Sequence, residues 1–189
     1  MKRQRNLSIL AILVLVALVG YIFAVRPQSS AQDAVTAAGQ APPPSVAPIA
    51  GHVAPDFTLT DLQGRSVTLS SLRGRPVFLN FFASWCPPCK TETPDLVSLY
   101  QRYGKHVRFI GVDMTPGDTL AGVHYYVKAF GVPYPVLLDR TGAVETAYGV
   151  IDIPTSFFIN SSGVIMSRIV GLMSPAMMHA RFAKLLSSH

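Results

Sequence analysis

The chain has 189 residues, enough for one domain of ordinary size with extensions, and 49% of them are hydrophobic while only 14% are charged. Its formal net charge of +6 could suit a nucleic-acid binder. However, four of the cations flank an apolar N-terminal run: Lys2, Arg3, Arg5 and Arg26. From residue 51 onward there are 12 Lys and Arg against 9 Asp and Glu, with no basic block among aromatic residues, so nucleic-acid binding is excluded.

The first expected element is an apolar helix over residues 7–25, which are 19 consecutive residues without a charge. A helix needs ~20 such residues to cross the core of a bilayer. The preceding cations predict a cytoplasmic N-terminus, and Tyr21 and Phe23 suit the far interface. The alternative is a cleaved signal peptide with small residues at 29–31, but its apolar core would span only ~7–15 residues. Both interpretations place the remainder outside the cytoplasm, and we assign residues 1–26 to a cytoplasmic tip and a transmembrane anchor.

Residues 27–50 follow with five prolines and no aromatic residue. A segment of this composition buries too little surface to offset the entropy lost on ordering, so it predicts a flexible linker. A folded domain is then expected over residues 51–189.

Within the domain, alternating apolar and polar residues predict a β-hairpin of strands 57–60 and 66–69. A near-continuous apolar run predicts a buried strand at 76–83, and a helix over 90–103 follows it. The later pattern predicts strand 107–113, helix 118–130, strand 136–139, helix 143–148, strands 155–159 and 164–170, and a last helix from Pro175 capped by Ser174. This order predicts an α/β fold, a central mixed β-sheet flanked by helices.

The only two cysteines stand between the predicted buried strand and its helix, in Trp85-Cys86-Pro87-Pro88-Cys89-Lys90. A disulfide across so short a loop stabilises little, which disfavours a purely structural role. Zinc needs four ligands and no second pair stands at a matching spacing, so a metal site would need a partner to complete it. At a helix start, backbone N–H groups and the helix dipole favour a thiolate. The pair therefore predicts thiol-disulfide exchange, with Cys86 as nucleophile and Cys89 as the resolving residue.

These motifs resemble the thioredoxin superfamily, in which a Cys-x-x-Cys helix is followed, here about 65 residues on, by Ile153-Pro154-Thr155. Three features narrow the resemblance to the membrane-anchored TlpA/ResA-like thiol-disulfide oxidoreductases. They are Ala54-Pro55-Asp56-Phe57-Thr58-Leu59, Asn80-Phe81-Phe82-Ala83-Ser84-Trp85, and an insertion around 115–133. The resemblance covers residues 51–188 and implies a thioredoxin-like fold with an N-terminal β-hairpin extension and an inserted helix.

The resemblance also implies which residues contact a substrate. The bond before Pro154 should be cis, which would present the Ile153 backbone to a substrate strand. Trp85, Pro87 and Pro88 would contribute from the cysteine side, although Trp85 could equally be a core residue.

Glu92 lies three residues beyond Cys89 and therefore on the same helix face. In the resembling group an acid at this place takes part in proton movement at the cysteines; an ordinary solvated carboxylate is the alternative. Asn80 stands where cytoplasmic thioredoxins carry a buried aspartate, and the loss of that proton acceptor favours a catalytic Glu92.

Together these features predict a single-pass oxidoreductase of a bacterial cell membrane with its domain outside the cytoplasm. The resemblance implies a reductant in cytochrome c maturation or similar envelope protein assembly. Its clients would be proteins with disulfides, such as apocytochrome c, and its electron donor a membrane carrier of the CcdA or DsbD type. No cofactor beyond the Cys86–Cys89 dithiol, and no metal, is expected.

Two other functions remain as alternatives. One is a Sco-type copper chaperone, which is disfavoured because that chemistry uses Cys-x-x-x-Cys with a distant His. The other is a general disulfide oxidase. A peroxiredoxin is weaker still, since Trp85 and its neighbours replace the expected Thr-x-x-Cys.

Overall fold

The computed structural model describes Tyr21 and residues 44–187 of the chain. The predicted anchor, apart from Tyr21, and residues 27–43 of the predicted linker lie outside this described part. Within it, no helix is both long enough and apolar enough to cross a membrane.

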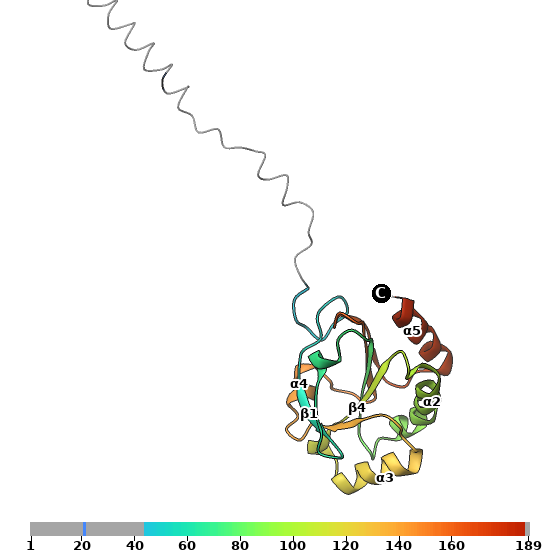
Figure 1. The fold of residues 1–189 in the computed structure, drawn as a ribbon. Coiled ribbons are helices and arrows are strands. Elements are labelled where there is room, and N and C mark those ends of the chain that lie inside the picture. The colour runs from blue at the N-terminus through green and yellow to red at the C-terminus, as the bar shows by residue number, and fades with distance from the viewer. Residues whose placement is uncertain (1–20, 22–43, 188–189) are drawn as a thin grey trace, which may run out of the picture. The chain divides into compact units, whose positions relative to one another are not determined.

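The described elements follow the predicted order (Figure 1). The strands are β1 (Thr58–Asp61), β2 (Ser66–Thr68), β3 (Val77–Phe82), β4 (Arg108–Asp113), β5 (Val136–Leu138), β6 (Thr155–Ile159) and β7 (Ile165–Val170). The helices are α2 (Pro87–Tyr103), α3 (Leu120–Phe130), α4 (Ala143–Ala147) and α5 (Pro175–Ser187), with short 3-10 turns η1 (Leu69–Leu72) and η2 (Thr115–Gly117).

The described strands form one sheet in the order β2-β1-β5-β4-β3-β6-β7. The central pairs β3–β4 and β4–β5 are parallel, whereas the other neighbours are antiparallel. The hairpin β1–β2 extends the sheet beyond β5. The mixed sheet, the N-terminal hairpin and the helix inserted between β4 and β5 are therefore confirmed.

Alternating side chains of β3 build cores on both faces of the sheet. Phe78 faces α5, where its ring centroid lies 5.1 Å from that of Phe182. Phe81 points to the opposite face and packs against Tyr148, which follows α4, at 5.3 Å. Because residues two apart share a face of a strand, Asn80 lies on the same face as Phe78, the side that α2 and α5 cover. β3 thus sits at the centre of the fold and carries the chain directly to the cysteines.

Helix α2 begins at Pro87, three residues before the predicted start at Lys90. Pro87 and Pro88 occupy its first positions, where backbone N–H groups have no partner inside a helix. Proline therefore costs no hydrogen bond there, and its fixed φ suits the helix. As a result Cys89 lies within the first turn instead of ahead of it.

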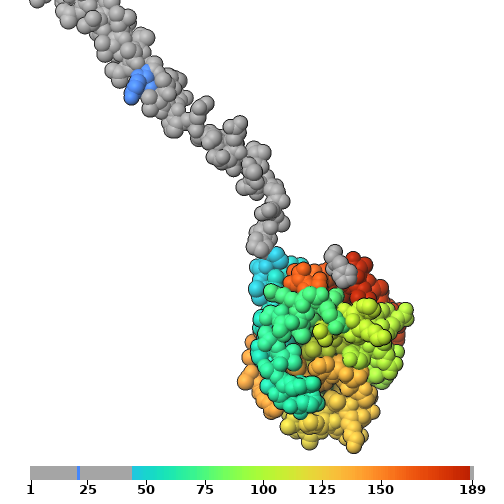
Figure 2. Space-filling view, in the orientation of Figure 1, coloured from blue at the N-terminus to red at the C-terminus, as the bar shows by residue number. Residues whose placement is uncertain are grey.

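The folded unit also begins before residue 51. The Ala47 N–H donates to the Val53 carbonyl at 3.1 Å, and the Val53 N–H donates to the Ser45 carbonyl at 3.0 Å. The Gly51 N–H donates to the carbonyl of Ile165, at the start of β7, at 2.8 Å. Figure 2 shows this segment (cyan) at one end of the domain and α3 (yellow) at the other. Backbone pairing, which composition does not reveal, holds the last residues of the predicted linker.

Candidate active site

The two cysteines lie at the junction of β3 and α2 and form a disulfide. Cys86 is the N-cap residue of α2, and its Sγ accepts a hydrogen bond from the Cys89 N–H at 3.2 Å. The Cys86 N–H in turn donates to the Ala83 carbonyl at 3.1 Å, which fixes the turn. When the pair is reduced, the same N–H group and the positive end of the helix dipole favour a thiolate on Cys86.

The disulfide is enclosed by residues that the resemblance implicates in substrate binding. Cys86 and Cys89 are each only 2% exposed, whereas Pro87 and Pro88 lie at the surface. Trp85 is 57% exposed and its Nε1–H donates to the Gly117 carbonyl at 2.7 Å. The interpretation of Trp85 as a core residue is therefore wrong, because its indole lies at the surface beside the pair.

The bond between Ile153 and Pro154 is cis, as the resemblance implies. The Ile153 carbonyl oxygen lies 3.8 Å from Cys86 Sγ, so the structure brings together two segments far apart in the sequence. Pro154 is buried, and its carbonyl accepts the Gly171 N–H at 2.7 Å. The backbone of Ile153 thus forms one wall of the site, with Cys86 opposite it.

Glu92 is buried on the sheet-facing side of α2, with 1% of its surface exposed, so the alternative of a solvated carboxylate is wrong. Burial raises the pKa of Glu92 from 4.5 to about 7, and the nearby Asp95 charge acts in the same direction. The Met173 N–H and the Asn80 amide favour the ionised form, but neither is in full hydrogen-bond geometry with a Glu92 oxygen. A carboxyl group with a pKa near 7 can take up or release a proton at neutral pH.

Asn80 is the uncharged polar side chain of β3, the strand that leads to the two cysteines. It is 5% exposed and its Nδ2 donates to Ser156 Oγ, on the neighbouring strand β6, at 2.9 Å. The amide is thus engaged across the sheet, and the buried carboxyl on this side of the pair is Glu92.

The inserted helix α3 reaches the site through Tyr126, which the sequence analysis did not single out. The Tyr126 and Thr93 hydroxyls are hydrogen-bonded to each other, and both reach the Cys89 carbonyl oxygen, at 3.2 and 2.7 Å. The Tyr126 ring stacks on Phe82 with centroids 4.9 Å apart. Burial raises the pKa of Tyr126 to about 12, so the phenol stays protonated and can donate at neutral pH. Helical spacing predicted the apolar face of α3 but could not show its partner.

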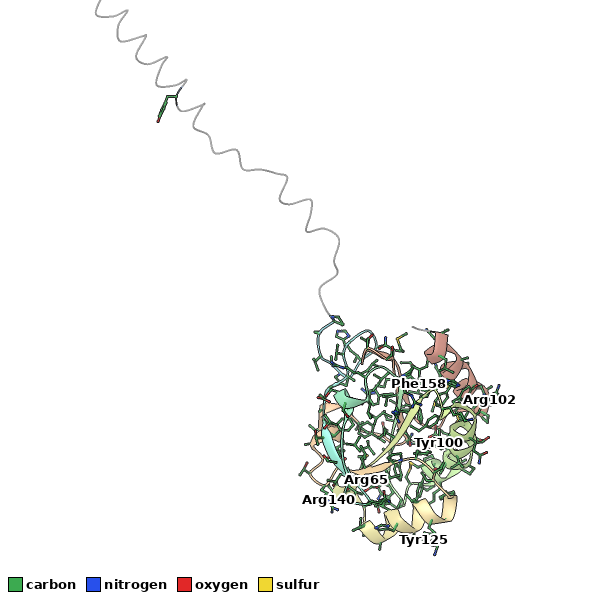
Figure 3. All side chains as sticks on the ribbon, in the orientation of Figure 1. Arg65, Tyr100, Arg102, Tyr125, Arg140 and Phe158 are labelled. Atoms are coloured by element: carbon green, nitrogen blue, oxygen red, sulfur yellow. A yellow bond between two sulfur atoms is a disulfide. The ribbon has the colours of Figure 1, made fainter. Side chains whose placement is uncertain are left out.

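Replacing Tyr126 with Phe should lower the free energy of unfolding by about 1 kcal/mol, because it removes the buried hydroxyl and its hydrogen bonds to Thr93 and to the Cys89 carbonyl oxygen. Tyr125 is the matched control: it is 75% exposed and is labelled on the outer side of α3 in Figure 3. Tyr125→Phe should change stability by less than about 0.5 kcal/mol. Urea unfolding of the oxidised full chain would measure both, and equal stabilities would contradict a structural role for the Tyr126 hydroxyl.

No three His, Cys, Asp or Glu side chains gather closely enough to hold a metal ion within Tyr21 and residues 44–187. The chemistry that the described site offers is that of two sulfurs, the buried Glu92 carboxyl group, the Tyr126 and Thr93 hydroxyls and the surrounding backbone.

Comparison with known proteins identifies the family to which the chain belongs. Residues 50–168 match the model described as the AhpC/TSA family. The thiol-disulfide oxidoreductase ResA of Bacillus subtilis (strain 168) is 39% identical over 132 residues, which cover 68% of this chain and 72% of that protein. The ResA of Geobacillus thermodenitrificans (strain NG80-2) is 40% identical over 125 residues, covering 66% and 71%.

Solved structures agree. A thiol:disulfide interchange protein, a thioredoxin family protein from Chlorobium tepidum TLS, superposes with a TM-score of 0.65 at 33% identity, covering 78% of this chain and 99% of that one. StoA from Bacillus subtilis superposes with a TM-score of 0.60 at 29% identity, covering 67% and 96%. The chain therefore belongs to the AhpC/TSA family of the thioredoxin superfamily, has the ResA enzymes among its relatives, and is a thiol-disulfide oxidoreductase.

Proposed function

We propose that this oxidoreductase is a membrane-tethered reductant that acts outside the cytoplasm on disulfides of envelope proteins, with apocytochrome c as its client. The observation that carries the chemical part is the Cys86–Cys89 disulfide at the start of α2, with the buried Glu92 carboxyl on the same helix face. This arrangement supplies a nucleophile, a resolving thiol and a carboxyl group that can accept the proton of the resolving thiol.

In the proposed first step, the Cys86 thiolate of the reduced enzyme attacks one sulfur of the client disulfide. The client S–S bond breaks, its second sulfur leaves as a thiolate, and a mixed disulfide with Cys86 forms. The positive end of α2 stabilises the attacking thiolate, and the backbone of Ile153 offers an edge along which an extended client segment can pair.

In the second step Cys89 loses its proton and attacks Cys86 Sγ. The Cys86–Cys89 disulfide re-forms and the client leaves as a dithiol, so two electrons pass from the enzyme to the client. We assign the Cys89 proton to Glu92, because the carboxyl group is buried on the same helix face and has a pKa of about 7.

The reducing direction and the location are supported by other features. The uncharged run at 7–25 suits a membrane anchor, and the resemblance to the TlpA/ResA group implies reduction. Because the outside of the cytoplasm is oxidising, the enzyme needs a supply of electrons, for which we propose a membrane thiol carrier of the CcdA or DsbD type. The haem-attaching Cys-x-x-Cys of an apocytochrome must be reduced before ligation, which makes it a suitable client.

Trapping tests the proposal. In a bacterium that makes c-type cytochromes, Cys89→Ser should accumulate mixed disulfides on Cys86, because the resolving thiol is missing. We expect apocytochrome c among the trapped proteins, identified by non-reducing electrophoresis and mass spectrometry. The double variant with Cys86→Ser is the matched control and should trap nothing. A trapped set of many unrelated secreted proteins without apocytochrome would instead indicate a general oxidase.

A further inference from the structure

The turn between β3 and α2, which ends at Cys86, is hydrogen-bonded to the loop after β4. Ser84, the second residue of the β3–α2 turn, donates two hydrogen bonds to the Asp118 carboxylate, one from its N–H and one from its hydroxyl at 2.7 Å. These bonds join residues 34 positions apart in the chain. A further hydrogen bond to Asp118 comes from the Thr119 N–H at 2.6 Å.

Two further contacts fasten the same loop to the same turn. The Met114 N–H donates to the Phe82 carbonyl at 3.0 Å. On the other side of Ser84, the Trp85 indole N–H donates to the Gly117 carbonyl at 2.7 Å. The loop therefore holds the chain at the end of β3, at Ser84 and at the residue before Cys86.

Gly122, in the first turn of α3, lies against both Ser84 and Asp118, and a side chain at this position would collide with them. A Cβ atom there would lie 2.6 Å from Ser84 Oγ and 3.1 Å from Asp118 Oδ1. Contacts under 3.0 Å do not occur between real Cβ atoms and their neighbours, so Gly122 permits the Ser84–Asp118 hydrogen bonds.

Behind Asp118 lies a second carboxyl group, that of Asp113 at the end of β4, which is fully buried. Burial and the Asp118 charge raise the pKa of Asp113 to about 8, so it is protonated at neutral pH. Burial acts to raise the pKa of Asp118, but the hydrogen bonds from Ser84, Thr119 and Asp113 outweigh it, and the pKa is lowered. Asp118 is thus the ionised member of the pair, with its charge directed at the Ser84 donors.

Asp118 could simply be an acid that stabilises the start of α3 through the helix dipole. The N-cap of α3, however, is Thr119, whose Oγ1 accepts the Gly122 N–H at 3.1 Å. Two of the hydrogen bonds that Asp118 accepts come from Ser84, which is not part of α3, and the others come from the Thr119 N–H and the Asp113 carboxyl. The hydrogen bonds of Asp118 therefore serve mainly the active-site turn.

We propose that Asp118 is a positioning residue for disulfide exchange: it fixes the Ser84–Trp85–Cys86 turn so that the Cys86 sulfur stays at the N-terminus of α2 and against Ile153. Without its two bonds to Ser84, the turn would move and the reduced Cys86 would lose part of the helix stabilisation of its thiolate. The role holds for either direction of electron flow, so it does not depend on the proposed client.

The test uses the full chain in detergent micelles. In a Cys89→Ser background, so that only Cys86 reacts, Asp118→Ala should slow alkylation of Cys86 by iodoacetamide at pH 6 by up to about tenfold, because the thiolate loses part of its stabilisation by the helix end. With Asp118 in place Asp113 is protonated at that pH, so the comparison starts from a single ionisation state of the pair. Because Trp85 is the only tryptophan of the chain, its fluorescence reports on the turn alone and should shift in the same variant.

Thr119→Ala is the matched control, since it removes the cap of α3 but leaves both bonds from Ser84 to Asp118. It should leave alkylation and Trp85 fluorescence unchanged. Should Asp118→Ala not fold, Ser84→Ala removes the hydroxyl bond alone and should shift both readouts in the same direction, by less. Unchanged alkylation in the Asp118 and Ser84 variants, or equal effects of Thr119→Ala, would overturn the proposal.

Discussion

Replacing Glu92 with Gln is expected to raise the free energy of unfolding at pH 8 by about 3 kcal/mol and to leave it nearly unchanged at pH 4. The pKa of this carboxyl rises from 4.5 to about 7 in the folded chain. Between those two values the folded state keeps a proton that the unfolded state releases, so the stability of the wild type falls as the pH rises. Gln cannot ionise, so the variant loses this slope.

Urea unfolding of the oxidised full chain at several pH values between 4 and 8 would measure the difference. Asp152→Asn, which removes a negative charge from an exposed position, is the control for net charge. Equal pH slopes in the Glu92→Gln variant and the wild type would show that Glu92 does not keep its proton in the folded state.

The same substitution should slow the resolving step of exchange by about 10²–10⁴-fold, the usual contribution of a general base. The pH profile of that step should also lose its ionisation near 7, where the pKa of Glu92 lies. Stopped-flow decay of a mixed disulfide between Cys86 and a chromogenic thiol would follow it. If the thiolate titration of the pair is unchanged in the variant, Glu92 has no part in proton transfer.

Cys86→Ser is expected to reduce disulfide exchange to the uncatalysed rate, because a serine hydroxyl is not ionised at neutral pH and cannot replace the thiolate. Cys89→Ser should behave differently: Cys86 still attacks a disulfide, releases one equivalent of thiol and then stops. The two variants share the loss of the disulfide, which stabilises little across so short a loop, so a difference in folding does not explain the contrast.

A reduced chain mixed with a chromogenic disulfide would show the contrast as a single burst for Cys89→Ser and no burst for Cys86→Ser. A burst from the Cys86→Ser variant would mean that Cys89 is the nucleophile. That result would conflict with the position of Cys86 at the helix N-cap.

The order of strands and helices could be predicted because each element has its own local signal. The apolar run of β3, the alternation in the β1–β2 hairpin and the helical spacing in α3 each depend on residues close in sequence. The sequence pattern predicts α2 only from Lys90, whereas the helix begins at Pro87, because Pro87 and Pro88 occupy first-turn positions that tolerate proline.

The site was predictable only in part, for a physical reason. The cysteine motif is local, and the position of Ile153 and Pro154 came from a family resemblance. Tyr126 and Asp118 act through hydrogen bonds that link segments more than 30 residues apart, which no local pattern encodes. The sequence did contain one indication of this region. Asp113 is the last residue of a predicted parallel strand, and functional groups are often found at the carboxyl ends of such strands in α/β sheets.

The entry point of the chain has a practical consequence. Residues 45–53 join the domain beside Ile165, at the start of β7. Through β6, this point lies at the same end of the sheet as Val77, the first residue of β3, whereas Cys86 follows the last residue of β3. The six residues of β3 span ~20 Å. A domain attached to an electrode or a bead directly at residues 45–53 would therefore carry its sulfurs at the far end of β3, about one strand length from the attachment point.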